Sequence, residues 1–173
     1  LRAYIVESET EGQPCNHEER AMVYLRAKDV TAVEPFASQI ERDKPPYEWL
    51  SHSMAARLPD THDPRVRVGA PGTAQPYDAS VFNISAMSFG SLGAHAIEAL
   101  NRGAAKGGFY HDTGEGGISV YHEAGGGDLV FELGSGYFGA RAKDGRFDPG
   151  MFAENAAREQ VRMIEVKLSQ GAK

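Results

Sequence analysis

The sequence predicts a parallel α/β fold, and two observations carry that prediction. Beyond Pro76, strand-like runs alternate with helix-like runs, and a helix between two strands is the long crossover that a parallel sheet requires. Each strand-like run also leads into a glycine-rich loop, and ligands of α/β proteins bind where loops follow the carboxyl ends of strands. The pattern suits a closed barrel or an open sheet, and in both cases we expect the functional site at this edge.

Residues 1–79 are expected to form a mixed accessory segment. They contain eight of the nine prolines, which favours turns and extended connections. Asn16 and Glu19 stand at capping-box spacing ahead of apolar residues with a helical period, so we expect a helix over 17–30. A short extended run follows at 65–68.

Residues 80–173 are expected to form the α/β domain. A strand at 81–86 leads to a helix over 92–106, which Ser91 would cap and a glycine pair would close. Asp148 followed by Pro149 predicts the start of a second helix. Apolar strands bounded by turn residues are expected at 109–113, 129–133 and 163–169, and the second helix is expected at 150–159.

Composition excludes several classes of protein. With 173 residues, 41% of them hydrophobic and 24% charged, the chain has the make-up of a globular domain. A formal net charge of −6 disfavours nucleic acid as a partner. We find no apolar run of membrane-spanning length and no signal peptide, so we expect a cytoplasmic protein. The chain starts at Leu1 rather than Met, and we expect it to be a fragment of a longer protein.

The sequence offers no metal site. Cys15 is the single cysteine, so the chain contains neither a disulfide nor a cysteine cluster for zinc or iron–sulfur. His111 and His122 lie near glycine loops without a third ligand at a suitable spacing, which favours polar packing. The glycines at 134–139 match a dinucleotide-binding pattern, but a polar turn follows them where that motif needs a helix.

Two local features point toward chemistry. On the last predicted strand, alternation puts Glu165 and Lys167 on the face opposite Ile164 and Val166. Buried charge must be paired, so the two form either a structural ion pair or a site in which Lys167 offers positive charge to an anionic cofactor. Glu115 stands in the glycine loop 113–117, where it would steer or exchange a proton, although such loops are also common turns.

Taken together, the glycine loops resemble those of a known family. The segments 84–92, 107–117, 135–139 and 164–173 look like the FMN-binding domain of glutamate synthase, in its stand-alone bacterial branch. The resemblance implies that 80–173 is the N-terminal portion of an FMN-binding (β/α)8 TIM barrel whose second half is missing. It also implies an oxidoreductase that forms L-glutamate from 2-oxoglutarate and ammonia or glutamine nitrogen, by flavin reduction of an imino intermediate.

The resemblance implies a role for particular residues, position by position. Glu115 and Lys167 would be catalytic, with Lys167 also facing the pyrimidine edge of the flavin. Gly171 and Lys173 would bind the oxoacid, with Lys173 pairing a substrate carboxylate. The remaining cofactor-binding positions would be Met87, Ser88, Phe89, Gly90, Thr113, Ser135 and Gln170.

The family also implies partners and leaves alternatives open. FMN is the expected cofactor, whereas an iron–sulfur cluster would belong to the parent protein, because this chain has no ligands for one. We expect the rest of the barrel or another chain as a partner, with an electron donor protein and a membrane-associated parent as further expectations. The alternatives are a related N-substituted glutamate synthase and a non-catalytic module derived from the barrel.

Overall fold

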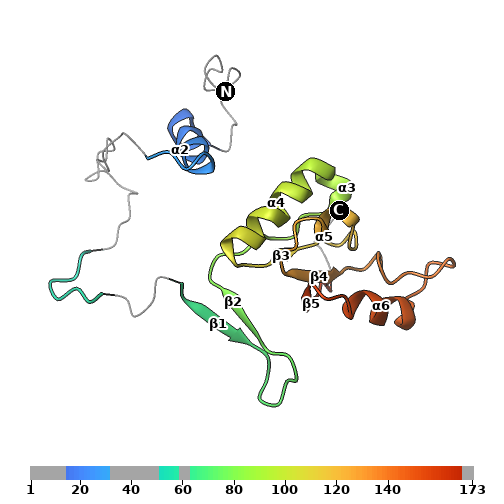
Figure 1. The fold of residues 1–173 in the computed structure, drawn as a ribbon. Helices are drawn as coiled ribbons and strands as arrows, with labels where there is room; N and C mark the ends of the chain where they lie inside the picture. The colour runs from blue at the N-terminus through green and yellow to red at the C-terminus, as the bar shows by residue number, and fades with distance from the viewer. Residues whose placement is uncertain (1–14, 32–50, 59–62, 169–173) are drawn as a thin grey trace. The chain divides into compact units, whose positions relative to one another are not determined.

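The structure is a computed structural model, and it describes residues 15–31, 51–58 and 63–168 (Figure 1). Contacts between residues divide the chain into two compact units, Leu1–Ala56 and Arg57–Lys173. The predicted mixed α/β class is confirmed, because the second unit combines helices with one antiparallel and one parallel sheet.

The described helix of the first unit is α2, His17–Ala27, and its start was predicted correctly. The side chain of Asn16 accepts a hydrogen bond from the Glu19 amide at 2.8 Å, while Glu19 accepts one from the Asn16 amide at 2.8 Å. This reciprocal capping satisfies two amides that would otherwise lack partners. The predicted end at residue 30 is wrong, because Asp29 turns the chain out of the helix with a φ of 56°.

An antiparallel hairpin opens the described part of the second unit. Strands β1, Arg65–Val68, and β2, Tyr77–Ser80, pair in register, and the Arg67 guanidinium binds the Asp78 carboxylate across them at 2.7 Å. The extended run at 65–68 is thus confirmed, whereas β2 was not predicted. The Tyr77 hydroxyl donates to Asp128 at 3.0 Å, and partial burial together with this carboxylate raises the pKa of Tyr77 to about 12.

A three-stranded parallel sheet forms the centre of the second unit. Its strands are β3, His111–Asp112, β4, Leu129–Leu133, and β5, Val161–Val166, and they lie side by side in chain order. The predicted strand at 81–86 is reduced to a parallel bridge, in which the Ile84 amide donates to Tyr110 and its carbonyl accepts from Asp112, both at 3.0 Å. Four chain segments therefore run parallel and in order.

The helices of the second unit lie in the connections between consecutive parallel segments. They are α3, Phe89–Leu92, α4, Ala94–Gly107, α5, Val120–Glu123, and α6, Pro149–Ala156. Helix α4 contacts β3 and α5, whereas α6 contacts β5 (Figure 1).

Two details of the predicted helices are wrong. The helix expected from residue 92 is split, because Gly93 has a φ of 80° between α3 and α4. Gly93, and not Ser91, is consequently the N-cap residue of α4. Helix α6 begins at Pro149 with Asp148 as its cap, as predicted, but it ends at Ala156 rather than at residue 159.

The core of the second unit lies around β4. Leu129 and Phe131 are fully buried on the side that faces the helices, and the Phe131 ring packs against Phe152 of α6 with centroids 5.9 Å apart. From α4, Ile97 and Ala104 are fully buried as well. Within the described part of the chain, no helix combines the length and apolarity needed to cross a membrane.

The burial of Ile97 predicts the effect of its truncation. The Ile97→Ala variant should lose about 2–5 kcal/mol of unfolding free energy, because it removes buried methyl groups and leaves a cavity. Urea denaturation followed by circular dichroism measures the loss. In the control Val120→Ala, the side chain is 71% exposed and the change should stay within about 0.5 kcal/mol. Equal losses in the two variants would contradict this account of the core.

Candidate functional site

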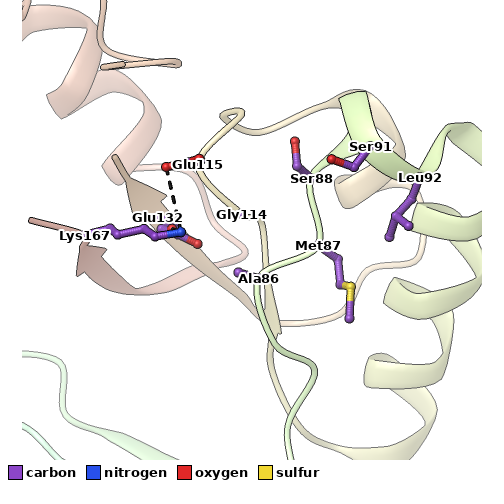
Figure 2. Close-up of a pocket in the computed structure, with 9 residues that line it drawn as sticks. All are labelled: Ala86, Met87, Ser88, Ser91, Leu92, Gly114, Glu115, Glu132 and Lys167. Carbon is purple, nitrogen blue, oxygen red and sulfur yellow. Dashed lines mark ion pairs between the residues drawn. The ribbon is translucent and has the colours of Figure 1, made fainter. Parts of the chain in front are cut away.

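A cavity of about 290 Å³ opens at the carboxyl ends of the parallel segments (Figure 2). Its lining comes from the loop after Ile84, helix α3, the loop after β3, β4 itself and the residue that follows β5. The lining residues are Ala86, Met87, Ser88, Ser91, Leu92, Gly114, Glu115, Glu132 and Lys167. The cavity thus lies at the sheet edge where the alternation of strands and glycine loops predicted a site.

The loop after β3 can approach the cavity wall closely because it contains glycine. Gly114 has a φ of +67°, and a Cβ atom there would lie 2.8 Å from the amide nitrogen of Ser88. No side chain fits in that space, and L residues rarely adopt that backbone conformation. Glycine at this position therefore lets two cavity-lining segments touch through their backbones.

Met87 is held in the cavity wall by two hydrogen bonds of its main chain. Its amide donates to the Asp112 carbonyl at 3.1 Å, and its carbonyl lies 2.9 Å from Nε2 of His122. Nδ1 of the same ring accepts from the Ser119 amide at 3.1 Å, so Nε2 carries the proton and donates to Met87. His122 is fully buried, and this burial lowers the pKa of its imidazole. The neutral ring orients the loop that carries Met87.

Lys167 carries the positive charge of the cavity. Its Nζ lies 3.6 Å from Oε1 of Glu132 and 3.8 Å from Oε2 of Glu115 (Figure 2). The predicted alternation on β5 is confirmed, since Glu165 lies beside Glu132 in the sheet register and Lys167 follows on the same face. The ion pairs that Lys167 makes are with the two carboxylates of neighbouring segments, and not with Glu165.

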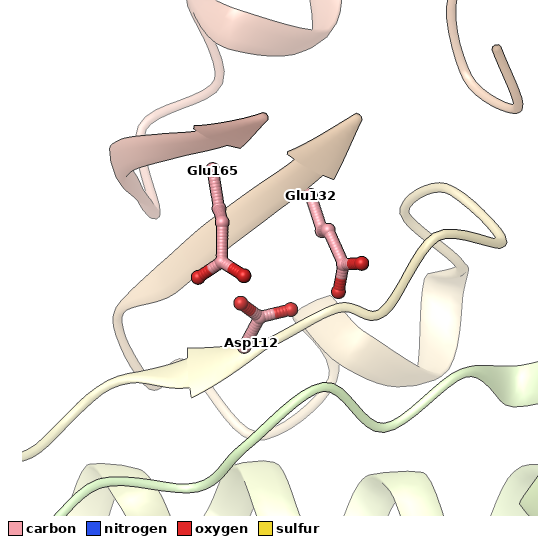
Figure 3. Close-up of side chains that lie close together, drawn as sticks. All are labelled: Asp112, Glu132 and Glu165. Carbon is pink, nitrogen blue, oxygen red and sulfur yellow. The ribbon is translucent and has the colours of Figure 1, made fainter. Parts of the chain in front are cut away.

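Three carboxyl groups meet on the face of the sheet that carries Glu132 (Figure 3). Oxygens of Asp112, Glu132 and Glu165 lie within 4.8 Å of one another, and the first two side chains are 2% and 1% exposed. Burial raises the pKa of Asp112 to about 7, against the hydrogen bond from the Gly114 amide, and the charges of Glu165 and Glu132 raise it further. Asp112 is therefore a buried acid that holds a proton well above its usual range.

Two buried histidines, His111 of β3 and His122 of α5, pack against each other. The ring centroids of His111 and His122 are 5.2 Å apart, and burial lowers the pKa of His111 to about 4. Neither ring nitrogen of His111 has a hydrogen-bond partner among the described residues. His122 makes the polar contacts predicted for this pair, whereas His111 packs against its ring without a hydrogen bond to any described residue.

The structure brings four of the predicted site residues together at one cavity, namely Met87, Ser88, Glu115 and Lys167. Four others lie outside its lining. Phe89 stacks on Tyr121 with centroids 5.0 Å apart, Gly90 is in α3, Thr113 is buried with its Oγ1 accepting from the Glu132 amide, and Ser135 is exposed. Gln170, Gly171 and Lys173 lie outside the described residues.

Glu132 and Asp112 belong to the site but were not predicted from the sequence. A signal was present for Glu132, because it is the one charged residue in the apolar run 129–133. A carboxylate inside such a run must face another polar group, since unpaired charge is costly inside a protein. Asp112 carried a weaker signal, because it stands at the end of a strand beside a glycine loop.

The close approach at Gly114 predicts a specific cost for a methyl group. The Gly114→Ala variant should lose about 2–5 kcal/mol of unfolding free energy, because it combines an unfavourable φ with a backbone clash. Gly126→Ala is a matched control, since Gly126 has a φ of +74° but no described atom within 4 Å of the added Cβ. It should lose only about 1–2 kcal/mol. Chemical denaturation compares the two, and equal losses would refute the close approach.

The buried acid predicts a pH dependence of stability. Folded Asp112 keeps its proton to about pH 7, whereas an unfolded aspartate releases it near 3.8, so between these values the folded state binds more protons. Asp112 therefore lowers stability as the pH rises through that window, by at most ~1.4 kcal/mol per pH unit. His111 acts in the opposite direction, because its folded pKa of about 4 makes the protein less stable as the pH falls.

Asp112→Asn isolates the first effect. The asparagine oxygen can still accept from the Gly114 amide, but it does not ionise. Relative to the unmodified protein, the variant should gain stability between about pH 5 and about pH 8, because the contribution of His111 is common to both proteins. Denaturation midpoints across this range measure the difference, and a constant difference would show that Asp112 ionises normally.

Comparisons with known proteins identify relatives of this chain. The family model described as "Conserved region in glutamate synthase" matches residues 71–173. A curated relative, the glutamate synthase large subunit-like protein YerD of Bacillus subtilis (strain 168), is 46% identical over 90 residues, which cover 51% of this chain and 17% of that protein. The chain thus spans a small part of this relative's length, and no solved structure matches it. Because the family model covers more than half of its residues, the chain belongs to the glutamate synthase family.

Proposed function

We propose that this chain is part of an FMN-dependent oxidoreductase of the glutamate synthase type, in which Lys167 lies against the flavin ring. The observation that carries the proposal is the ammonium of Lys167 at the edge of a cavity lined by Met87, Ser88 and the glycine loop at Gly114. Glutamate would form from 2-oxoglutarate and ammonia or glutamine nitrogen. FMN, when bound, supplies the hydride that reduces the imino group to an amine.

The residues present are suited to the ring portion of FMN. The cavity volume of about 290 Å³ is near the lower end of small-molecule sites, ~300 Å³, and its lining combines apolar side chains with a few polar ones. The backbone at Gly114 comes close without a side chain in the way. Of the described lining residues, Lys167 is the one cation, and a fixed ammonium stabilises negative charge far better in a dry pocket than in water.

The chain's own residues would bind, orient and hold charge. Lys167 would face the part of the ring that becomes electron-rich, and the main chain at Met87, fixed by His122 and β3, would position the ring plane. Glu115 lies on the glycine loop beside the cavity and would exchange a proton near the reacting atoms. Gln170, Gly171 and Lys173 belong to the same proposal on the strength of the family resemblance.

The same proposal extends to the architecture. Ile84, β3, β4 and β5 run parallel and side by side in chain order, as consecutive strands of a (β/α)8 barrel do. The side chain of Val166 on β5 is 59% exposed, and that of Leu168, just after the strand, is 87% exposed. Such an apolar edge supports a partner that covers it, which would be the rest of the barrel or another chain.

Replacement of Lys167 tests the function. The protein that contains this chain should carry bound FMN, visible in its absorbance spectrum. Once dithionite has reduced this flavin, the addition of 2-oxoglutarate and ammonia should reoxidise it and form glutamate. Lys167→Met should lower the rate by about 100-fold, the order of magnitude lost with one group that stabilises developing charge. Lys143→Met is the control, because Lys143 is exposed and outside the cavity lining.

Two results would contradict the proposal in different ways. If the protein contains no bound flavin, both FMN as the cofactor and the proposed function are refuted. If the protein binds flavin but does not react with 2-oxoglutarate, the cofactor is supported and 2-oxoglutarate is refuted as the substrate.

A further inference from the structure

Lys167 has two acidic partners that differ in their surroundings. Glu132 lies in the middle of the sheet on β4, where its side chain is 1% exposed. Glu115 lies on the glycine loop after β3, where its side chain is 30% exposed. The distances from Nζ are similar, 3.6 Å and 3.8 Å, so the two carboxylates are distinguished by burial and backbone support and not by proximity.

The backbone of Glu132 is held firmly. Its amide donates to Oγ1 of Thr113 at 3.1 Å, and its strand is flanked by β3 on one side and β5 on the other. Glu165 is its neighbour in the register, and Lys167 is two residues further along the chain, directly after β5. A short, rigid path of sheet structure therefore connects the carboxylate with the ammonium.

The carboxylate of Glu132 is buried, and no hydrogen bond to either of its oxygens is found among the described residues. The side chain of Asp112, which holds its proton to about pH 7, lies beside it, and its interaction with Glu132 helps to raise the pKa of Asp112. A buried carboxylate in this condition is costly unless it meets a positive charge, and the described cation beside it is the ammonium of Lys167. The other charged groups that face it, Asp112 and Glu165, are acidic and cannot supply that charge.

We propose that Glu132 is the positioning residue for Lys167: it holds the ammonium at the cavity edge, in the place where the flavin ring requires it. This inference rests on the proposed function. The negative charge of Glu132 by itself opposes reduction of the flavin, because a carboxylate repels an electron-rich ring. In this role Glu132 has an effect through Lys167 that outweighs this direct effect. It acts through Lys167, and Glu115 on its loop is the second, more exposed partner.

The FMN reduction potential separates positioning from direct charge. Lys167→Met should lower the potential, because reduced flavin loses its cation. If Glu132 positions the ammonium, the isosteric change Glu132→Gln should lower it too and should weaken FMN binding by about tenfold, a typical contribution of a supporting partner. If Glu132 acts only by its own charge, removing that charge should raise the potential, and this result would overturn the proposal.

Three further variants sharpen the comparison in the flavin-loaded protein. Glu132→Asp keeps the buried charge and should restore part of the potential and binding lost in Glu132→Gln. Glu165→Gln removes a carboxylate from the same cluster without removing an ion-pair partner of Lys167, so it should not lower the potential. In the Lys167→Met background, Glu132→Gln should cause no further decrease, because no ammonium remains to be positioned.

A measurement without flavin keeps this proposal separate from the proposed function. In flavin-free protein, the rate of Lys167 acylation by an amine reagent should rise severalfold in Glu132→Gln, while Lys143 serves as the internal reference. If the protein binds no FMN, the proposed function fails but this rate still reports whether Glu132 holds the amine. An unchanged acylation rate in folded Glu132→Gln, or in Glu132→Met if the glutamine variant does not fold, would overturn the positioning role.

Discussion

The candidate site depends on one cation that meets several carboxyl groups on one face of a small parallel sheet. One ammonium, on Lys167, meets the buried carboxylate of Glu132 and the loop carboxylate of Glu115, with Asp112 directly beneath. Charges are costly in such surroundings unless opposite charges compensate them, so each group restricts where the others can lie. This mutual restriction turns three separate chain segments into one site and gives the cavity its single described cation.

The backbone supplies the second constraint, because the loops must come close enough for these side chains to meet. Gly114 lets the loop after β3 touch the segment at Ser88, and the neutral ring of His122 fixes the adjacent carbonyl of Met87. The cavity wall is thus built from main-chain contacts, while the chemistry resides in a few side chains that point into it. This division suits the proposed flavoprotein, in which the cofactor would perform the chemistry and the protein would provide orientation and electrostatic field.

Much of the local structure could be predicted from the sequence, for identifiable physical reasons. The helix starts at Asn16 and Asp148 were predictable because capping depends on residues three positions apart or fewer. Strand β4 was predictable from its continuous apolar run. Helix ends were less accessible, and Gly93 divided an expected helix by a positive φ that periodicity does not reveal. Strand β2 was missed because its pairing with β1 is a contact between segments and not a local pattern.

The sequence by itself determined the α/β class of fold, the sheet edge at which the cavity opens, and the placement of Lys167 on the same face as Glu165, because these follow from alternation along single strands and from glycine after each strand. Only the tertiary structure decided which carboxylates Lys167 would meet. Its partners come from residues 35 and 52 positions earlier in the chain, and no spacing rule connects segments that distant. From the sequence, Glu132 is only the one charged residue in an apolar run. The register between the strands and the burial of Glu132 place its carboxylate beside Lys167, where it is the counter-charge of the site.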